Sequence, residues 1–146
     1  AVDADHKQRY EKAVKQQHSR TAEGLQFAQQ TYTELLAHPR LQLQQQQGPS
    51  QHQGLTAGNL KLRLLCLSNL GNVYEQQQAY KEALDCYVEA AQLDEQRTQT
   101  WHRMGIVAVE LQRYRLARFA FEQGGRDAVW ALRFLITILT DFNVVI

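Results

Sequence analysis

Hydrophobic residues between Leu64 and Arg97 recur at steps of three and four positions, with polar residues between them. This spacing places the hydrophobic residues on one face of an α-helix. The pattern is broken at 78–80 and then resumes. The stretch therefore predicts two amphipathic helices that are joined by a tight turn.

The same pattern returns 34 residues later in the chain. Seven positions keep their size class or become slightly smaller: Leu67 and Trp101, Leu70 and Met104, Gly71 and Gly105, Tyr74 and Ala108, Ala83 and Ala117, Tyr87 and Phe121, Ala90 and Gly124. Gly71 and Gly105 lack a Cβ atom, so we expect the two helices of each unit to approach closely there. Tyr87 and Phe121 are predicted to fill the space toward the following unit. The period and pattern resemble the tetratricopeptide repeat (TPR), which implies an all-α fold, a TPR superhelix (α-solenoid) of antiparallel helix pairs.

The pattern divides the chain into one TPR array with five parts. These are a degenerate first repeat at 1–37, a glutamine-rich flexible insertion at 38–58, a second repeat at 64–97, a third at 98–126, and the first helix of a truncated fourth repeat at 127–146. The insertion has no periodic apolar face and contains Gly48 and Pro49, which is typical of a flexible linker. Helices are predicted at 2–18, 24–37, 59–77, 80–93, 98–111 and 114–124.

The segment that follows Trp130 is apolar around most of its circumference if it is helical. A terminal helix of a solenoid normally has a polar outer side, because nothing covers it. We therefore expect either that the chain belongs to a longer array or that this helix pairs with a second copy. The residues available for self-association are Leu132, Phe134, Leu135, Ile138, Leu139 and Phe142. No apolar run reaches the roughly 20 residues of a membrane span.

Composition and charge add few constraints to this picture. The formal net charge is +1, and the arginines lack interleaved exposed aromatic residues, so direct nucleic-acid binding is not indicated. Cys66 and Cys86 fall on predicted core faces and are expected to be reduced. The polar start of the chain is unlike a signal peptide, and we expect a nuclear or cytosolic protein.

The sequence contains no recognisable catalytic or metal-binding motif. None of its five histidines has a metal-ligand spacing, and it has neither a glycine-rich phosphate loop nor a nucleophile elbow. His38 and His52 lie in or beside the insertion, where we expect them to be solvated. We therefore expect no enzyme activity, no cofactor, no metal and no small-molecule substrate.

The first helix of each TPR lines the concave surface of the array. The repeat register places six candidate partner-binding residues there: Asn69, Asn72, Gln76, Gln99, His102 and Arg103. TPR co-chaperones bind the C-terminal carboxylate of a chaperone through asparagine, lysine and arginine residues, and Asn69 and Arg103 match that pattern. Gln99 stands where the lysine is expected and cannot make charge-assisted hydrogen bonds. A co-chaperone adaptor for an acidic C-terminal tail is therefore the second hypothesis.

A closer resemblance covers about residues 24–142. It rests on TYTELLAHPRL before the insertion, on EALDCYVEAAQLDEQ followed by TWHRMGIVAVELQRYRLARFAFEQG, and on a tryptophan followed by LITILTDF. These stretches resemble the TPR scaffold subunits of the HIR histone-chaperone complex, a family that includes the animal calcineurin-binding protein Cabin. The resemblance implies a nuclear, non-enzymatic scaffold in replication-independent nucleosome assembly and transcription regulation. Its implied partners are HIR-complex subunits and histones, whereas calcineurin inhibition is implied only in animal members and outside this chain.

Overall fold

The computed structural model describes residues 4–42 and 57–125, and in these residues the fold consists of helices without strands. The six helices are α1 (Ala4–His18), α2 (Ala22–Ala37), α3 (Ala57–Gln76), α4 (Tyr80–Leu93), α5 (Thr98–Glu110) and α6 (Tyr114–Gln123). The all-α prediction is confirmed, and each predicted helix boundary lies within two residues of the observed one. Residues 43–56 of the insertion and the whole predicted fourth-repeat helix, with its six self-association residues, lie outside the described residues.

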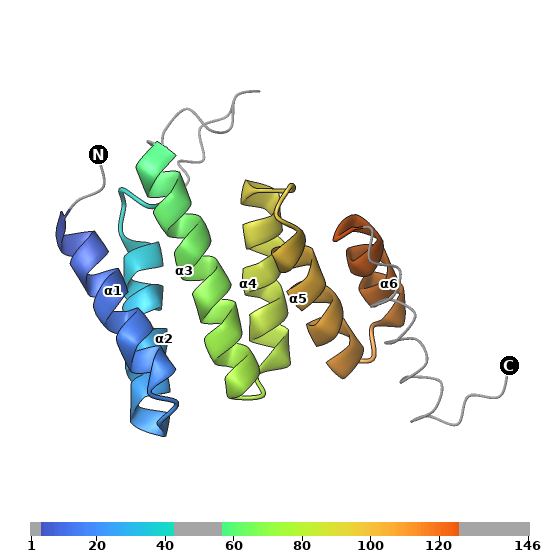
Figure 1. Ribbon diagram of the computed structural model, residues 1–146, viewed down its shortest axis with the longest axis horizontal. Helices are drawn as coiled ribbons and strands as arrows, with labels where there is room; N and C mark the ends of the chain where they lie inside the picture. The colour runs from blue at the N-terminus through green and yellow to red at the C-terminus, as the bar shows by residue number, and fades with distance from the viewer. Residues whose placement is uncertain (1–3, 43–56, 126–146) are drawn as a thin grey trace, which may run out of the picture.

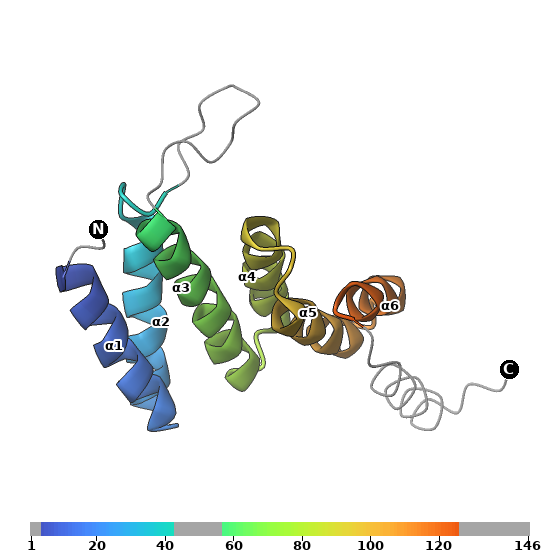
Figure 2. The same cartoon turned by 45° about the horizontal axis from the view of Figure 1, so that its top comes forward.

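The helices follow one another in chain order along the longest axis of the described part, from α1 at one end to α6 at the other (Figure 1). The turned view shows the same order (Figure 2). Each helix packs against the next one, and α1 also reaches past α2 to contact α3. None of the described helices is long and apolar enough to cross a bilayer.

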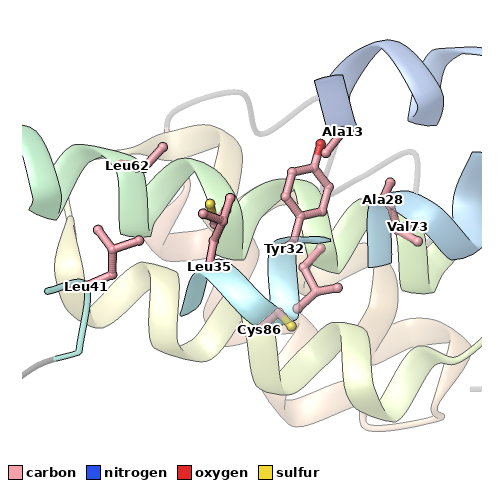
Figure 3. Close-up of a cluster of buried hydrophobic side chains, with 10 residues drawn as sticks. Ala13, Ala28, Tyr32, Leu35, Leu41, Leu62, Val73 and Cys86 are labelled. Atoms are coloured by element: carbon pink, nitrogen blue, oxygen red, sulfur yellow. The ribbon is translucent and has the colours of Figure 1, made fainter. Parts of the chain in front are cut away.

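The buried apolar side chains form two clusters. The first joins α1, α2, α3 and Cys86 of α4, and Figure 3 shows Tyr32 of α2 with its hydroxyl group toward Ala13 of α1. The second joins α4, α5 and α6 around Tyr87 and Met104. Tyr74 is partly buried and packs against both clusters. The two cores are therefore continuous through a residue near the end of α3.

The two glycines at equivalent repeat positions lie beneath aromatic rings of the partner helix. A Cβ atom on Gly71 would lie 2.7 Å from Cε1 of Tyr87, and one on Gly105 would lie 2.5 Å from Cε1 of Phe121. The predicted close approach of the paired helices is confirmed. Both aromatic rings fill space within their own helix pair. Tyr87 also belongs to the core shared with α5 and α6, as predicted. The unit that follows Phe121 lies outside the described residues.

The turns inside these two helix pairs have the same geometry. Gln78 and Gln112, which are 34 residues apart, both adopt the left-handed conformation, with φ of 60° and 58°. The residue after each glutamine donates its backbone N–H to a carbonyl five residues earlier: Ala79 to Tyr74 and Arg113 to Ala108, both at 2.8 Å. The sequence period is thus a period of backbone geometry as well.

Two predictions about individual side chains can be compared with their burial. Cys66 and Cys86 are free and buried, as expected, and burial raises the pKa of each thiol to about 12. His38 is not solvated as predicted, because its half-buried ring packs edge-on against the buried ring of His6, with centroids 4.3 Å apart. His38 ends α2, and this position brings it to the start of α1. His52 lies outside the described residues.

Candidate functional site

A small polar cavity lies where α3, α4 and the start of α5 meet. Its volume is about 100 Å³. The residues that line it are Ser68, Asn69, Asn72, Tyr87, Arg97, Gln99, Thr100 and Arg103. Those from α3 are spaced by one, three and four positions, as are those from α5, so each helix contributes one face. The cavity is rich in hydrogen-bond donors that could contact another molecule.

The structure brings four of the six predicted partner-binding residues into this cavity: Asn69, Asn72, Gln99 and Arg103. The other two lie elsewhere. Gln76 Nε2 donates a hydrogen bond of 2.6 Å to Asn72 Oδ1, one turn earlier on α3. His102 packs edge-on against the Phe121 ring, with centroids 5.7 Å apart. Gln76 therefore supports the cavity wall, and His102 faces α6.

Polar side chains of α1 already contact the two asparagines, and one of them also contacts α2. Asn69 Nδ2 donates to the Tyr10 hydroxyl at 2.8 Å, and Gln17 Nε2 donates to Asn72 Oδ1 at 3.1 Å. Gln17 Oε1 in turn accepts a hydrogen bond of 2.9 Å from the Tyr32 hydroxyl. These bonds hold α1 and α2 against α3, so the asparagines have a structural role on the side of the cavity that α1 covers.

The charged residues of the cavity are two arginines and one nearby carboxylate. Arg103 Nη1 lies 3.5 Å from Glu75 Oε2, which is an ion pair but longer than a good hydrogen bond. Burial raises the pKa of Glu75, and the Arg103 charge opposes that shift. Arg97 is half-buried, and its guanidinium forms no ion pair with any residue that the structure describes. The cavity therefore carries excess positive charge.

Tyr87 lines the cavity with a hydroxyl group that has no hydrogen-bond partner within the described chain. The residue is only 2% exposed, and its hydroxyl and Glu75 Oε1 lie near one another without a well-formed hydrogen bond. Burial, followed by the charge of Glu75, raises the pKa of Tyr87, so the hydroxyl keeps its proton and is a donor. Leaving such a group unpaired costs about 1–3 kcal/mol.

The partner-binding residues predicted from the sequence do not include Tyr87, Arg97 or Thr100, which all line the cavity. Tyr87 has the pattern of a core aromatic residue, and its core contacts are indeed present. Arg97 and Arg103 are six positions apart and do not share a helical face. Only the turn that leads into α5 brings them to the same cavity, and no local sequence signal predicts that turn's direction.

The sequence relationships of the chain agree with one another. The family model of the CABIN1 N-terminal domain matches residues 4–135, which include every residue of the cavity. Calcineurin-binding protein 1 of Arabidopsis thaliana is 35% identical over 65 residues, which cover 43% of this chain and 4% of that protein. The chain thus corresponds to a small part of that relative. Because the family match spans well over half of its length, the chain belongs to the CABIN1 N-terminal domain family.

Proposed function

We propose that this chain is a non-enzymatic protein–protein interaction scaffold, built as a TPR superhelix, in a nuclear histone-chaperone complex of the HIR type. In this role it would contribute to replication-independent nucleosome assembly and to transcription regulation. The partners would be other subunits of the complex and histones. The family match over residues 4–135 is the single observation that carries the proposal.

The repeated geometry of α3–α4 and α5–α6 supports a TPR arrangement. Both pairs have an aromatic ring of the second helix on a glycine of the first, and both have the same left-handed glutamine in the turn. The offset between the pairs is 34 residues, which is the TPR period. TPR arrays present extended surfaces to protein partners, which fits a scaffold.

The chemistry of the cavity favours binding over catalysis. Ser68 donates its hydroxyl to the Leu64 carbonyl oxygen at 2.9 Å, and no histidine is among the lining residues to act as its base. The amide, hydroxyl and guanidinium groups of the lining can instead recognise a polar group of a partner by hydrogen bonds. A scaffold that holds a segment of another protein needs no more than this.

The proposal is tested by affinity capture of the tagged chain from nuclear extract, followed by quantitative mass spectrometry. A Gly105→Leu variant, in which the new side chain would overlap Phe121, provides a control with a disrupted α5–α6 pair. Arg115→Gln, on the exposed side of α6, provides a folded control. We expect the unchanged chain and the Arg115→Gln variant to capture HIR-complex subunits or histones. The Gly105→Leu variant should not capture them. Recovery of heat-shock chaperones instead, lost on Arg103→Ala, would support the co-chaperone adaptor.

A further inference from the structure

Three side chains of the cavity have hydrogen-bond donors that the described chain does not satisfy. The Arg97 guanidinium has no ion-pair partner among the described residues. The Tyr87 hydroxyl is buried beside the Glu75 carboxylate without a hydrogen bond of good geometry. Arg103 has five N–H donors. The carboxylate oxygen paired with it, Glu75 Oε2, is 3.5 Å from its Nη1 atom. A carboxylate accepts hydrogen bonds only and has two oxygens, so it is the complementary group.

The size of the cavity limits how much of a ligand it can hold. Its volume is about 100 Å³, whereas an apolar cavity of roughly 150 Å³ holds a benzene molecule. A carboxylate on one or two methylene groups therefore fits, whereas an aromatic side chain would not be fully enclosed. Because the cavity opens among polar residues of α3 and α5, the rest of the ligand would lie outside it along those helices.

Glu75 is a carboxylate of the chain itself that would compete with such a ligand for Arg103. Its carboxylate pairs with Arg103 through one oxygen, while the other oxygen, Oε1, is buried without a hydrogen bond. The Glu75 side chain is only 14% exposed, against 38% for Arg103. An incoming carboxylate would reach Arg103 from the solvent side, where part of the guanidinium is accessible, and would compete with Glu75 for its donors.

We propose that this cavity anchors one carboxylate of an acidic peptide between Arg97, Arg103 and Tyr87, and that Glu75 competes with the peptide for Arg103. The inference rests on the proposed scaffold function and names the chemistry of the partner at this site. The anchoring carboxylate is either an aspartate or glutamate side chain or the C-terminus of the peptide. Charge-assisted hydrogen bonds to the two arginines would provide most of the affinity.

The test is fluorescence anisotropy with the 146-residue chain and a short labelled peptide of alternating glutamate and glycine. The same peptide with glutamine in place of glutamate, amidated at its C-terminus, is the neutral control. The glutamate peptide is measured both as a free acid and as an amide. Undiminished binding of the amide assigns the anchor to a side chain, and binding only of the free acid assigns it to the C-terminus.

Matched variants separate the cavity from general charge attraction. Arg97→Gln and Arg103→Gln are each expected to weaken binding about tenfold or more, and Tyr87→Phe roughly threefold to tenfold, since these remove hydrogen bonds to a charged group. Arg115→Gln removes the same charge from exposed α6 and should change affinity less than about twofold. Glu75→Gln should tighten binding severalfold, whereas Glu82→Gln on the exposed face of α4 should not. Circular dichroism confirms that each variant is folded.

Several results would overturn the inference. These are equal binding of the glutamate and glutamine peptides, equal losses with Arg97→Gln and Arg115→Gln, or unchanged affinity with Glu75→Gln. The scaffold proposal would survive such results if Arg97→Gln still captured HIR-complex subunits, because the partner would then use another surface. Conversely, acidic-peptide binding without capture of those subunits would contradict the proposed complex and leave the anchoring site intact.

Discussion

The Tyr87 ring lies so close to Gly71 that a methyl group at that glycine would stand 2.7 Å from the ring carbon Cε1. Real side-chain carbons do not approach this closely, so an alanine there requires the ring or the helices to move. Tyr87 is almost fully buried, which leaves its ring little room. The contact thus fixes the distance between α3 and α4, and with it one wall of the cavity.

Gly71→Ala is therefore expected to destabilise the protein, although alanine is the better helix former. Overpacking costs about 1–3 kcal/mol and the gain in helix propensity is about 1 kcal/mol, so we expect a net loss of up to about 2 kcal/mol. The measurement is urea denaturation followed by circular dichroism. Gly105→Ala, opposite the less buried Phe121, should cost less. An equally large or larger loss at Gly105 would contradict the link between cost and burial.

Gln112→Gly is expected to stabilise the protein. Gln112 has a φ of 58°, where a residue with a side chain costs about 1–2 kcal/mol. Glycine removes this cost, but its greater freedom in the unfolded chain offsets part of the resulting stabilisation. We expect a net increase of roughly 0.5–1 kcal/mol in the free energy of unfolding. Gln78→Gly should behave alike, since its φ is 60°. Gln77→Gly, next to it but without a positive φ, should give no gain, and a gain there would argue against the conformational explanation.

Gln17→Ala should be among the more destabilising changes at a polar residue. The side chain is buried, accepts a hydrogen bond from Tyr32 and donates one to Asn72. Asn72 Oδ1 still accepts a hydrogen bond from Gln76, so the loss of Gln17 leaves one buried group, the Tyr32 hydroxyl, without a partner. An unsatisfied buried group costs about 1–3 kcal/mol, and we expect a loss of this size by chemical denaturation. Gln16→Ala removes the exposed neighbour on the same helix and should change stability by less than about 0.5 kcal/mol. Similar losses for both variants would show that the network contributes little.

Glu75→Gln should change how stability depends on pH. Because burial raises the pKa of Glu75, the folded protein keeps this proton to higher pH than the unfolded chain. The stabilisation is fully present below the ordinary carboxyl pKa and is lost as pH rises through the raised value. The difference in unfolding free energy between the Gln variant and the wild type should therefore shift in favour of the variant as pH rises above about 4. A difference that stays constant over this range would mean that Glu75 titrates as it does in the unfolded chain.

The helices were predictable because their limits are set by local signals. Ala83, Tyr87 and Ala90 repeat at helical spacing and are buried, and the polar turn before them breaks the pattern. The Gly71 contact was predictable for the same reason, because a glycine inside a helix is unfavourable unless something packs against it.

The candidate site was only partly predictable, because it depends on contacts between distant residues. Gln17 has a polar side chain of the kind usually found on the surface. Only the contact between α1 and α3 buries it beside Asn72. Nothing in the sequence near Arg97 shows that it lines the same cavity as Arg103, which lies on the following helix. Repeat register therefore located the faces of α3 and α5 that line the cavity, but not the groups that leave donors unsatisfied there.

Tyr74 packs against the apolar clusters on both sides of it. A repeat array in which each interface were independent could fray from one end while the other end kept its structure. Here the loss of α1 and α2 would uncover a side chain that the α4–α6 half also requires. The described helices are thus expected to lose structure together. A partner that stabilised the helices at one end would therefore also stabilise those at the opposite end.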